Sequence, residues 1–280
     1  MYSLHAIANL RTTVGNEVQT NSFKISDQEG VVMHNWSLRF YAIPGIPLIR
    51  AGDHIGRMIF DCAKSDGFIF KDGDIFIIAH KIVSRAENAI IKLADIEPSE
   101  QAIELSAKTG RDPRLCQIYI NESAEIVGTN GRMVITWHKL GFRDTCAGVD
   151  RTNVAPFTDE LVSLLPKDPD ASARAIRPQL KELIGKELAV IISDTFGSPS
   201  REGSFGVAIG IAGIRHIEIR EGTDVFGNLS KASVTLVDAL AGAAFSIMGQ
   251  SERLPVVIAR GAKYTKDEKA SIKNLLYRGV

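Results

Sequence analysis

Three uninterrupted apolar runs constrain the fold of this chain more than any other feature. They lie in the segments IFIIAHKIVS (75–84), ELAVIISD (187–194) and LPVVIAR (254–260). Apolar runs of this length, without a polar residue at every second position, are typical of strands buried on both faces of a sheet. Segments with apolar residues at helical spacing alternate with them. The sequence therefore predicts an α/β fold with mixed α+β character.

The remaining elements are predicted from periodicity and from residues that start or stop helices. We predict a strand that runs into a turn at 39–49, a strand at 132–138, a polar loop at 141–154, and helices at 54–67, 97–110, 112–127, 168–186, 231–249 and 266–279. Ile55, Met58 and Ile59 stand at helical spacing, and Pro113 suits the first turn of a helix. The segment 231–249 also has strand propensity at its start.

Composition argues against several classes of protein. The chain has 280 residues, with 33 basic and 33 acidic side chains. Because no net charge favours nucleic acid or an anionic membrane, neither is an expected partner. The apolar runs are too short to cross a bilayer, and the N-terminus does not read as a secretory signal. Three widely spaced cysteines, Cys62, Cys116 and Cys146, form no metal motif and fit a reduced, cytoplasmic protein.

Two acids are candidates for holding a divalent cation. Asp194 directly follows the apolar run LAVIIS, at the place where open α/β sheets bind their ligands. Mg²⁺ prefers carboxylate oxygens, and Thr195 can add a hydroxyl group. Asp150 stands three residues before Asn153, a spacing at which acid and amide can share a cation or divide contacts between metal and nucleotide. The alternatives are a capping role for Asp194 and an ordinary turn at Asp150.

A glycine-rich stretch follows Asp194. Gly203, Gly206 and Gly210 leave the backbone bare, so that amide groups can approach an anion, but close packing of a strand is the more ordinary explanation. Arg201 precedes these glycines. Its forked donors can bind a phosphate or a carboxylate, or the side chain is simply solvated.

A polar cluster also follows the first apolar run. His80, Lys81 and Arg85 belong to it, and two cations there suit a triphosphate or another anionic substrate, unless the segment is a solvated loop. The chain has no phosphate-binding P-loop, no dinucleotide fingerprint, no nucleophile elbow and no H-x-x-x-H motif. A nucleotide site would therefore differ from these common types.

Seven segments, taken together and in order, resemble a known family. They are PGIPLIRAGDHIGRMI, FKDGDIFIIAHKIVSRAE, CAGVDRTNV, LLPKDPDASARAIR, VIISDTFGSPSREGSFGVAIGIAG, GTDVFGN and SIMGQSERLPVVIARG. Over residues 38–261 the chain is similar to the coenzyme F420-0:L-glutamate (γ-glutamyl) ligases. The combination of these motifs is specific, although each alone is weak.

The resemblance implies a GTP-dependent enzyme that joins the α-amino group of L-glutamate to a carboxylate of coenzyme F420-0 and then adds further glutamates by γ-linkage. The implied cations are Mg²⁺ or Mn²⁺, with K⁺ in some relatives. The implied fold is mixed α/β and forms an intertwined homodimer. By this resemblance the ligase domain spans 38–262, and a boundary near 150–165 can divide it into two subdomains. An extension of uncertain order precedes it at 1–37, and a C-terminal helix follows at 263–280.

The resemblance also assigns roles to residues that match the family's motifs. Metal ligands by this assignment are Asp150, Asp194, Thr195 and Gln250, and the catalytic residues are Asp150, Asp194 and Arg201. The implied nucleotide contacts are Pro44, Gly45, Ile46, Pro47, His80, Arg85, Asn153, Met248, Gly249, Gln250 and Ser251. Gln250 stands where many relatives carry an acid, and Ser198 where they commonly carry arginine. A ligase for another acceptor and a non-catalytic nucleotide-binding protein are therefore the alternatives.

The chemistry implied is activation of a carboxylate. Transfer of a phosphoryl group makes an acyl phosphate, which an amine can attack. In this hypothesis Asp150 and Asp194 hold a metal that bridges phosphate oxygens, while Arg201 and the amides of the glycine-rich stretch stabilise the transferring charge. Lys81 or Arg85 can orient a carboxylate.

Overall fold

The computed structural model describes residues 37–154, 160–198, 201–249 and 251–276. All of them belong to one compact unit, Ser37–Val280. The extension expected at 1–37 lies outside the described residues except for Ser37.

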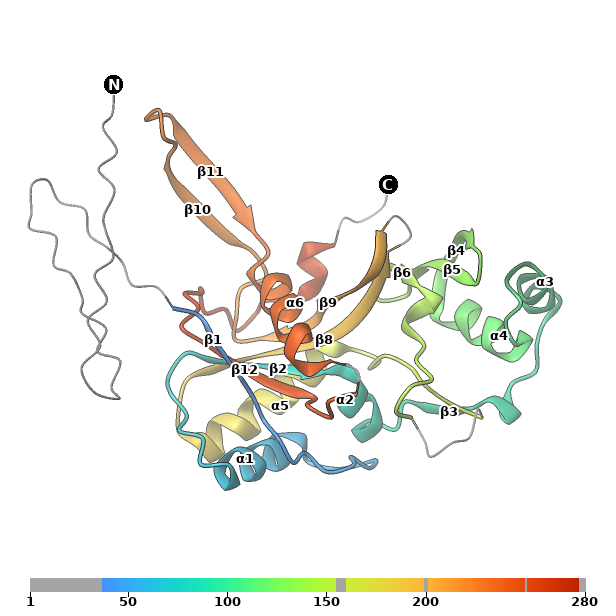
Figure 1. Ribbon diagram of the computed structural model, residues 1–280, viewed down its shortest axis with the longest axis horizontal. Helices are drawn as coiled ribbons and strands as arrows, with labels where there is room; N and C mark the ends of the chain where they lie inside the picture. Colours follow the sequence, from blue (N-terminus) through green and yellow to red (C-terminus); the bar gives the residue numbers. More distant parts are fainter. Residues whose placement is uncertain (1–36, 155–159, 199–200, 250, 277–280) are drawn as a thin grey trace, which may run out of the picture. The chain divides into compact units, whose positions relative to one another are not determined.

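A five-stranded mixed sheet forms the centre of this unit. Its strand order is β1 (Arg39–Ala42), β12 (Val256–Arg260), β2 (Asp74–Ala79), β8 (Leu188–Ser198) and β9 (Arg201–Ala212). Only β2 and β8 pair in parallel, and the other neighbours are antiparallel. The three apolar runs of the sequence thus lie side by side as β12, β2 and β8 (Figure 1). The mixed α/β fold predicted from the sequence is confirmed.

Helices cover both faces of the central sheet. On one face, Phe76 and Ile78 of β2 belong to the same apolar cluster as residues of α1 (Ile55–Ser65) and α5 (Pro169–Ile184). On the other face, Ile75 and Ile77 pack in a cluster with α6 (Leu236–Met248). Because successive side chains of a strand point to opposite faces, a strand between two helical layers must be apolar throughout.

The glycines of the glycine-rich stretch lie in strand β9 rather than in a phosphate-binding loop. A Cβ atom at Gly206 would lie 2.8 Å from Cβ of Phe245 in α6, and one at Gly210 would lie 2.6 Å from Cβ of Pro169 in α5. Real Cβ atoms do not approach this closely, so these two glycines let helices pack directly on the strand. The packing explanation holds for both.

A smaller layer stands beside the sheet. It contains α3 (Glu100–Thr109), α4 (Pro113–Glu122) and an antiparallel sheet of β4 (Ser123–Asn130), β5 (Met133–His138) and β6 (Arg143–Thr145). Ser99 and Asp112 cap the two helices, since their side chains accept hydrogen bonds from the first-turn amides of Ala102 and Arg114. A short pair, β3 (Ile90–Lys92) and β7 (Leu161–Ser163), adjoins this layer, and η1 (Leu93–Asp95) follows β3.

A two-stranded hairpin projects from the unit. It consists of β10 (Glu218–Thr223) and β11 (Leu229–Val234), which pair only with each other (Figure 1). Val225 and Phe226 at its tip and Leu229 at the start of β11 are 93%, 86% and 95% exposed.

Three predicted boundaries are wrong. The strand predicted over 75–84 ends at Ala79, and helix α2 (His80–Ala86) begins there, because the pairing with β8 ends at the same point. The helix predicted over 112–127 ends at Glu122, where β4 begins. The polar loop predicted over 141–154 contains strand β6 and the short helix η2 (Cys146–Gly148).

Two helices near the C-terminus also differ from their predictions. The helix predicted over 231–249 begins only at Leu236, because its first residues form strand β11, in agreement with their strand propensity. The described part of the helix predicted over 266–279 contains only the 3₁₀ helix η3 (Ile272–Leu275). The last four residues, 277–280, lie outside the described part.

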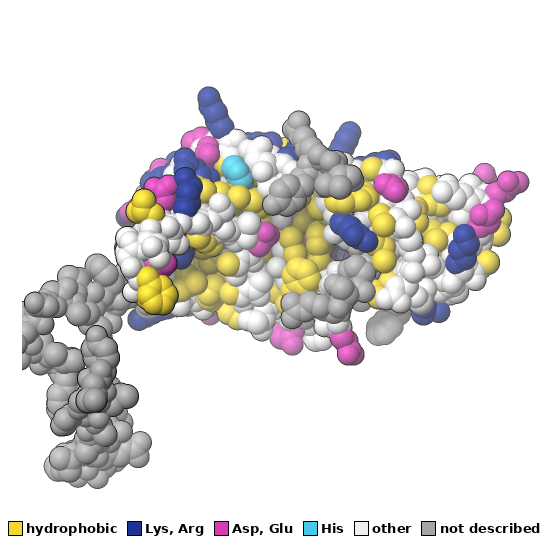
Figure 2. All heavy atoms as spheres, turned by 90° about the horizontal axis from the view of Figure 1, so that it is seen from above, with side chains coloured by type: hydrophobic (Ala, Val, Ile, Leu, Met, Phe, Trp, Pro, Cys, Tyr) yellow, Lys and Arg dark blue, Asp and Glu magenta, His cyan; other side chains and the backbone are white. Residues whose placement is uncertain are grey.

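The described surface carries charges of both signs. On the face drawn in Figure 2, basic and acidic side chains are intermixed and apolar side chains lie between them. Within the described residues, no helix is long and apolar enough to cross a membrane.

Candidate functional site

One large cavity, of about 1190 Å³, lies at the end of the parallel pairing between β2 and β8. Segments that are far apart in the sequence line it. They are residues 46–49, 79–82, 85, 111, 119, 133, 145–146, 148–154, 193–195, 197–198, 202–204, 206, 245, 248–249 and 253–255. Both candidate acids, Asp150 and Asp194, are among them.

Asp194 lies just beyond the parallel pairing of β2 and β8. That pairing ends at Ala79 and Ser193, and β8 continues to Ser198 alongside β9. Asp194 is therefore a strand residue and not a helix cap. His80 follows Ala79 as the first residue of α2, and its Nε2 atom lies 3.1 Å from Oδ1 of Asp194. Both side chains are buried, but the geometry is not that of a hydrogen bond.

Asp150 is the centre of a second polar cluster. Its Oδ2 atom lies 2.6 Å from Nζ of Lys81, and its Oδ1 atom accepts hydrogen bonds from the amide and hydroxyl groups of Thr152 at 2.7 and 2.8 Å. Burial raises the pKa of Asp150, but the charge of Lys81 and these hydrogen bonds lower it further, so the net pKa lies below its ordinary value. The carboxylate is charged at neutral pH. The hydrogen bonds from Thr152 to Asp150 also form the local turn that was the alternative explanation for Asp150.

Arg85 ties helix α2 to the loop that carries Asp150. Its Nη2 atom donates hydrogen bonds to the backbone oxygens of Asn153, at 2.7 Å, and of Val154. Burial lowers the pKa of Arg85. Asn153 has a left-handed backbone with φ of 58°, a conformation that asparagine adopts more readily than most residues. The cavity thus has two cations on α2, Lys81 and Arg85, and each has a defined anchor.

The donor chemistry of the two acids fits a hard divalent cation. Carboxylate and hydroxyl oxygens are the ligands that Mg²⁺ prefers, and Asp150, Asp194 and Thr195 all line the cavity. Among the described residues, no hydrogen bond engages Oδ2 of Asp194. No group of three or more His, Cys, Asp or Glu side chains with metal-binding geometry occurs in the described part of the chain. A metal would therefore need ligands from substrate or water.

The other predicted contacts divide into three groups. Ile46, Pro47, His80, Arg85, Asn153, Met248 and Gly249 line the cavity. Pro44, Gly45 and Ser251 are exposed and do not line it. The side chain of Arg201 and the whole of Gln250 lie outside the described residues, so their predicted roles stay predictions.

Sequence reasoning missed a buried polar group near Asp194. Asp144 is 4% exposed, and Thr136 donates a hydrogen bond to its Oδ1 atom, while Oδ2 has no partner among the described residues. Burial, together with the negative charge of Asp194, raises the pKa of Asp144 to about 7. His138 is buried as well, and desolvation lowers its pKa to about 4. No sequence pattern indicated that Asp144 is buried, because a polar loop is normally solvated.

The raised pKa of Asp144 predicts a pH-dependent stability. A carboxyl group with a folded pKa near 7 and an ordinary pKa of 3.8 stabilises the fold fully only below the ordinary value, and this contribution is lost as pH rises towards 7. We expect the free energy of unfolding of Asp144→Asn, relative to that of the wild type, to rise by up to about 1.4 kcal/mol per pH unit between pH 4 and 7. It should rise no further above pH 8. Urea unfolding at several pH values measures the difference.

The matched control is Asp224→Asn. Asp224 is fully exposed, and hydrogen bonds from Asn228 hold its pKa below the ordinary value. The difference in the free energy of unfolding between Asp224→Asn and the wild type is expected to be constant above pH 5. A level difference for Asp144→Asn across the same range would show that Asp144 is charged in the folded protein.

Comparisons with known proteins show the family to which the chain belongs. The model of the F420-0:gamma-glutamyl ligase family matches residues 45–261. The coenzyme F420:L-glutamate ligase of Methanothermobacter thermautotrophicus is 44% identical over 222 residues, which are 78% of this chain and 87% of that protein. Those of Methanopyrus kandleri and Methanocaldococcus jannaschii are 41% and 43% identical, over 81% and 78% of this chain and 88% and 85% of their own.

These matches make the chain an enzyme of the ligase class. It belongs to the F420-0:gamma-glutamyl ligase family, as the resemblance in its motifs indicated.

Proposed function

We propose that this protein forms an amide bond between L-glutamate and coenzyme F420-0, with hydrolysis of GTP to GDP and phosphate and with Mg²⁺ or Mn²⁺. The observation that carries the proposal is the convergence of Asp150, Asp194, His80, Lys81 and Arg85 on one cavity. Acids and cations side by side suit a metal-bound nucleotide, and the description of the family supplies the acceptor, F420-0.

The proposed reaction has two steps. The acceptor carboxylate attacks the γ-phosphorus of GTP, the bond to the β-phosphate oxygen breaks, and GDP leaves. The amine of glutamate then attacks the acyl carbon, phosphate leaves with the electron pair of the C–O bond, and the ammonium proton passes to solvent or phosphate. A divalent cation supplies charge neutralisation at the phosphate oxygens.

The residues of this chain bind and orient in that scheme. Asp150 and Asp194 hold the cation, and Thr195 adds a hydroxyl group from the residue after Asp194. Lys81 and Arg85 lie on one helix beside these acids and attract the anionic phosphates. Lys81 and Arg85 are held in place by Asp150 and by the backbone of Asn153 before substrate arrives, which is the condition for electrostatic catalysis.

Product analysis tests the proposal. Purified protein with F420-0, L-glutamate, GTP and Mg²⁺ is expected to yield the glutamyl amide by mass spectrometry, with one GDP and one phosphate per bond formed. Omission of any one component should stop product formation. Amide formation with another carboxylate but not F420-0 would assign a different acceptor. GTP binding without phosphate release in any mixture would assign a non-catalytic nucleotide-binding protein.

We also propose a homodimer, supported by hairpin β10–β11. An isolated two-stranded hairpin is marginally stable in water, and this one exposes Val225, Phe226 and Leu229 almost completely. Exposed apolar side chains that lie together are typical of a protein interface. We expect the wild type to have the mass of a dimer by light scattering, and Phe226→Asp to shift it to the monomer at micromolar concentration.

The control for the dimer is Ile103→Asp. Ile103 is a large apolar residue exposed on α3, so the change has the same chemistry at a different place. It is expected to leave the mass unchanged. A monomeric wild type, or a Phe226→Asp variant that stays dimeric, would contradict the role of the hairpin.

A further inference from the structure

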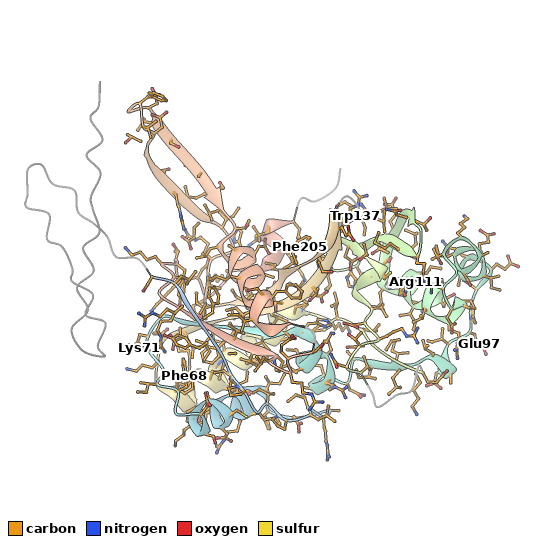
Figure 3. The ribbon with its side chains drawn as sticks, in the orientation of Figure 1. Phe68, Lys71, Glu97, Arg111, Trp137 and Phe205 are labelled. Atoms are coloured by element: carbon orange, nitrogen blue, oxygen red, sulfur yellow. The ribbon has the colours of Figure 1, made fainter. Side chains whose placement is uncertain are left out.

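A second set of lining residues, distinct from the two acids and their partners, also faces the cavity. Arg111, Tyr119, Met133 and Cys146 line it, and they come from the α3–α4 connection, α4, β5 and η2. Apart from Arg111, these side chains are apolar or weakly polar. Figure 3 labels Arg111, which lies beside α4 and the β4–β5 sheet.

Arg111 is held in a fixed orientation. Its Nε atom donates a hydrogen bond to the backbone oxygen of Arg132 at 2.5 Å, and its Nη1 atom donates to the hydroxyl of Tyr119 at 3.3 Å. The guanidinium also lies over the ring of Tyr119, 5.7 Å from its centre. Tyr119 is 2% exposed, so the ring is itself fixed by packing. A guanidinium positioned in advance loses little entropy when it binds an anion.

No acid neutralises Arg111 in the described part of the chain. Asp112, the next residue in the sequence, pairs with Arg114 at 2.8 Å, and Glu160 pairs with the same arginine at 3.1 Å. Arg111 is therefore a fixed cation that faces a cavity without a protein counter-charge. An anionic ligand group would complete it.

Residues that lie close to one another connect Arg111 to strand β8, which carries Asp194. Gly197 follows Asp194 in β8, and a Cβ atom there would lie 3.0 Å from Oγ1 of Thr145. Thr145 precedes Cys146, whose thiol interacts with the hydroxyl of Tyr119, the partner of Arg111. The cavity volume of about 1190 Å³ also exceeds the roughly 300–1,000 Å³ typical of a pocket for a single small molecule. A cavity of this volume is large enough for more than one small molecule.

We propose that Arg111 binds a carboxylate of one of the two substrates that are joined, glutamate or the acceptor. This inference rests on the proposed function. A carboxylate matches the planar fork of a guanidinium, and the apolar walls around Arg111 suit an organic substrate better than a triphosphate. The proposed nucleotide contacts include other cations that line the cavity, Lys81 and Arg85, both on helix α2.

Steady-state kinetics of Arg111→Gln and Arg111→Lys test the inference. Glutamate, F420-0 and GTP are varied in turn while the other two are saturating. We expect Arg111→Gln to raise the KM of one carboxylate substrate about 10- to 100-fold, the range for a lost hydrogen bond to a charged group, and to leave the KM of GTP unchanged. Which KM rises identifies the substrate. Arg111→Lys keeps the charge and should lose less.

Arg174→Gln is the matched control, because Arg174 lies on α5, is about half exposed and does not line the cavity. It should leave all three KM values unchanged. Unchanged KM values for both carboxylate substrates in Arg111→Gln would overturn the inference. A rise in the KM of GTP would also overturn it and assign Arg111 to the nucleotide.

Failure of the proposed function is recognised separately. It would show as no amide from the wild type. In that case, titration calorimetry of the protein with glutamate alone and with F420-0 alone tests whether Arg111 binds a carboxylate. Binding to the wild type that is at least tenfold weaker in Arg111→Gln supports the inference, and equal binding or none overturns it.

Discussion

Asp194→Asn is expected to lower kcat for amide formation by about 10²–10³, with little change in the midpoint of thermal unfolding. The loss follows because a neutral amide binds a divalent cation far more weakly than a carboxylate, and removal of one electrostatic contact to a transition state typically costs this factor. Stability should be kept, since the nearby Nε2 of His80 makes no hydrogen bond that the change would break. Product formation under saturating GTP, glutamate and Mg²⁺ measures the effect.

Two comparisons make this result specific. Asp61→Asn changes an exposed acid of α1, paired with Arg57, and should keep full activity. The double variant Asp150→Asn with Asp194→Asn should lose little more than the worse of the two single variants, because residues that act on one group are not additive. Multiplicative losses would show that the two acids serve separate steps. Near-normal turnover of Asp194→Asn would remove this residue from the mechanism.

Arg260→Met is expected to destabilise the fold by about 3–5 kcal/mol, the cost of leaving a buried charge without its partner. Asp74 is 1% exposed, and Arg260 donates to both of its carboxylate oxygens at 2.7 Å. The guanidinium is further fixed over the rings of Tyr41 and Phe68, at 5.3 and 4.9 Å from their centres. After the change, the backbone amide of Lys71 is the remaining hydrogen-bond donor to Asp74 that the structure describes.

Urea unfolding without ligands measures this loss. The matched control is Arg57→Met, which breaks the ion pair with Asp61 on the surface of α1, where the side chains are 62% and 52% exposed. Such pairs contribute at most about 1 kcal/mol. Adding Asp74→Asn to Arg260→Met should recover part of the stability, because the buried charge is then gone. Equal losses from the two arginine variants would contradict the importance of burial.

Much of the fold was predictable from local pattern. The runs that form β2, β8 and β12 have apolar side chains on both faces, which can be buried only between two layers. Their identity as strands and their burial therefore follow from the local apolar pattern. Where prediction was wrong, tertiary pairing decided. The segment after Ala79 is apolar enough for a strand, but β8 offers no further parallel partner beyond Ser193, and the chain turns into α2.

The candidate site was predictable in its acids and less so in their surroundings. Asp150, Asp194, His80 and Arg85 were proposed from the sequence and line one cavity. Arg111 was not, because nothing in the residues around it distinguishes a cavity cation from a solvated one. The glycines of β9 were ambiguous for the same reason, since bare backbone serves a phosphate and a packed helix equally well.

Sequence alone therefore determined which segments are buried strands, which family the motifs indicate and which acids are candidates for metal. Only the tertiary structure decided that Lys81 holds Asp150, that Asp144 is buried beside Asp194, and that Arg111 faces the cavity without a counter-charge. The physical reason is that burial and charge pairing depend on residues far apart in the chain. Local patterns record the preferences of a segment, whereas the pKa and availability of a side chain depend on the neighbours that folding brings to it.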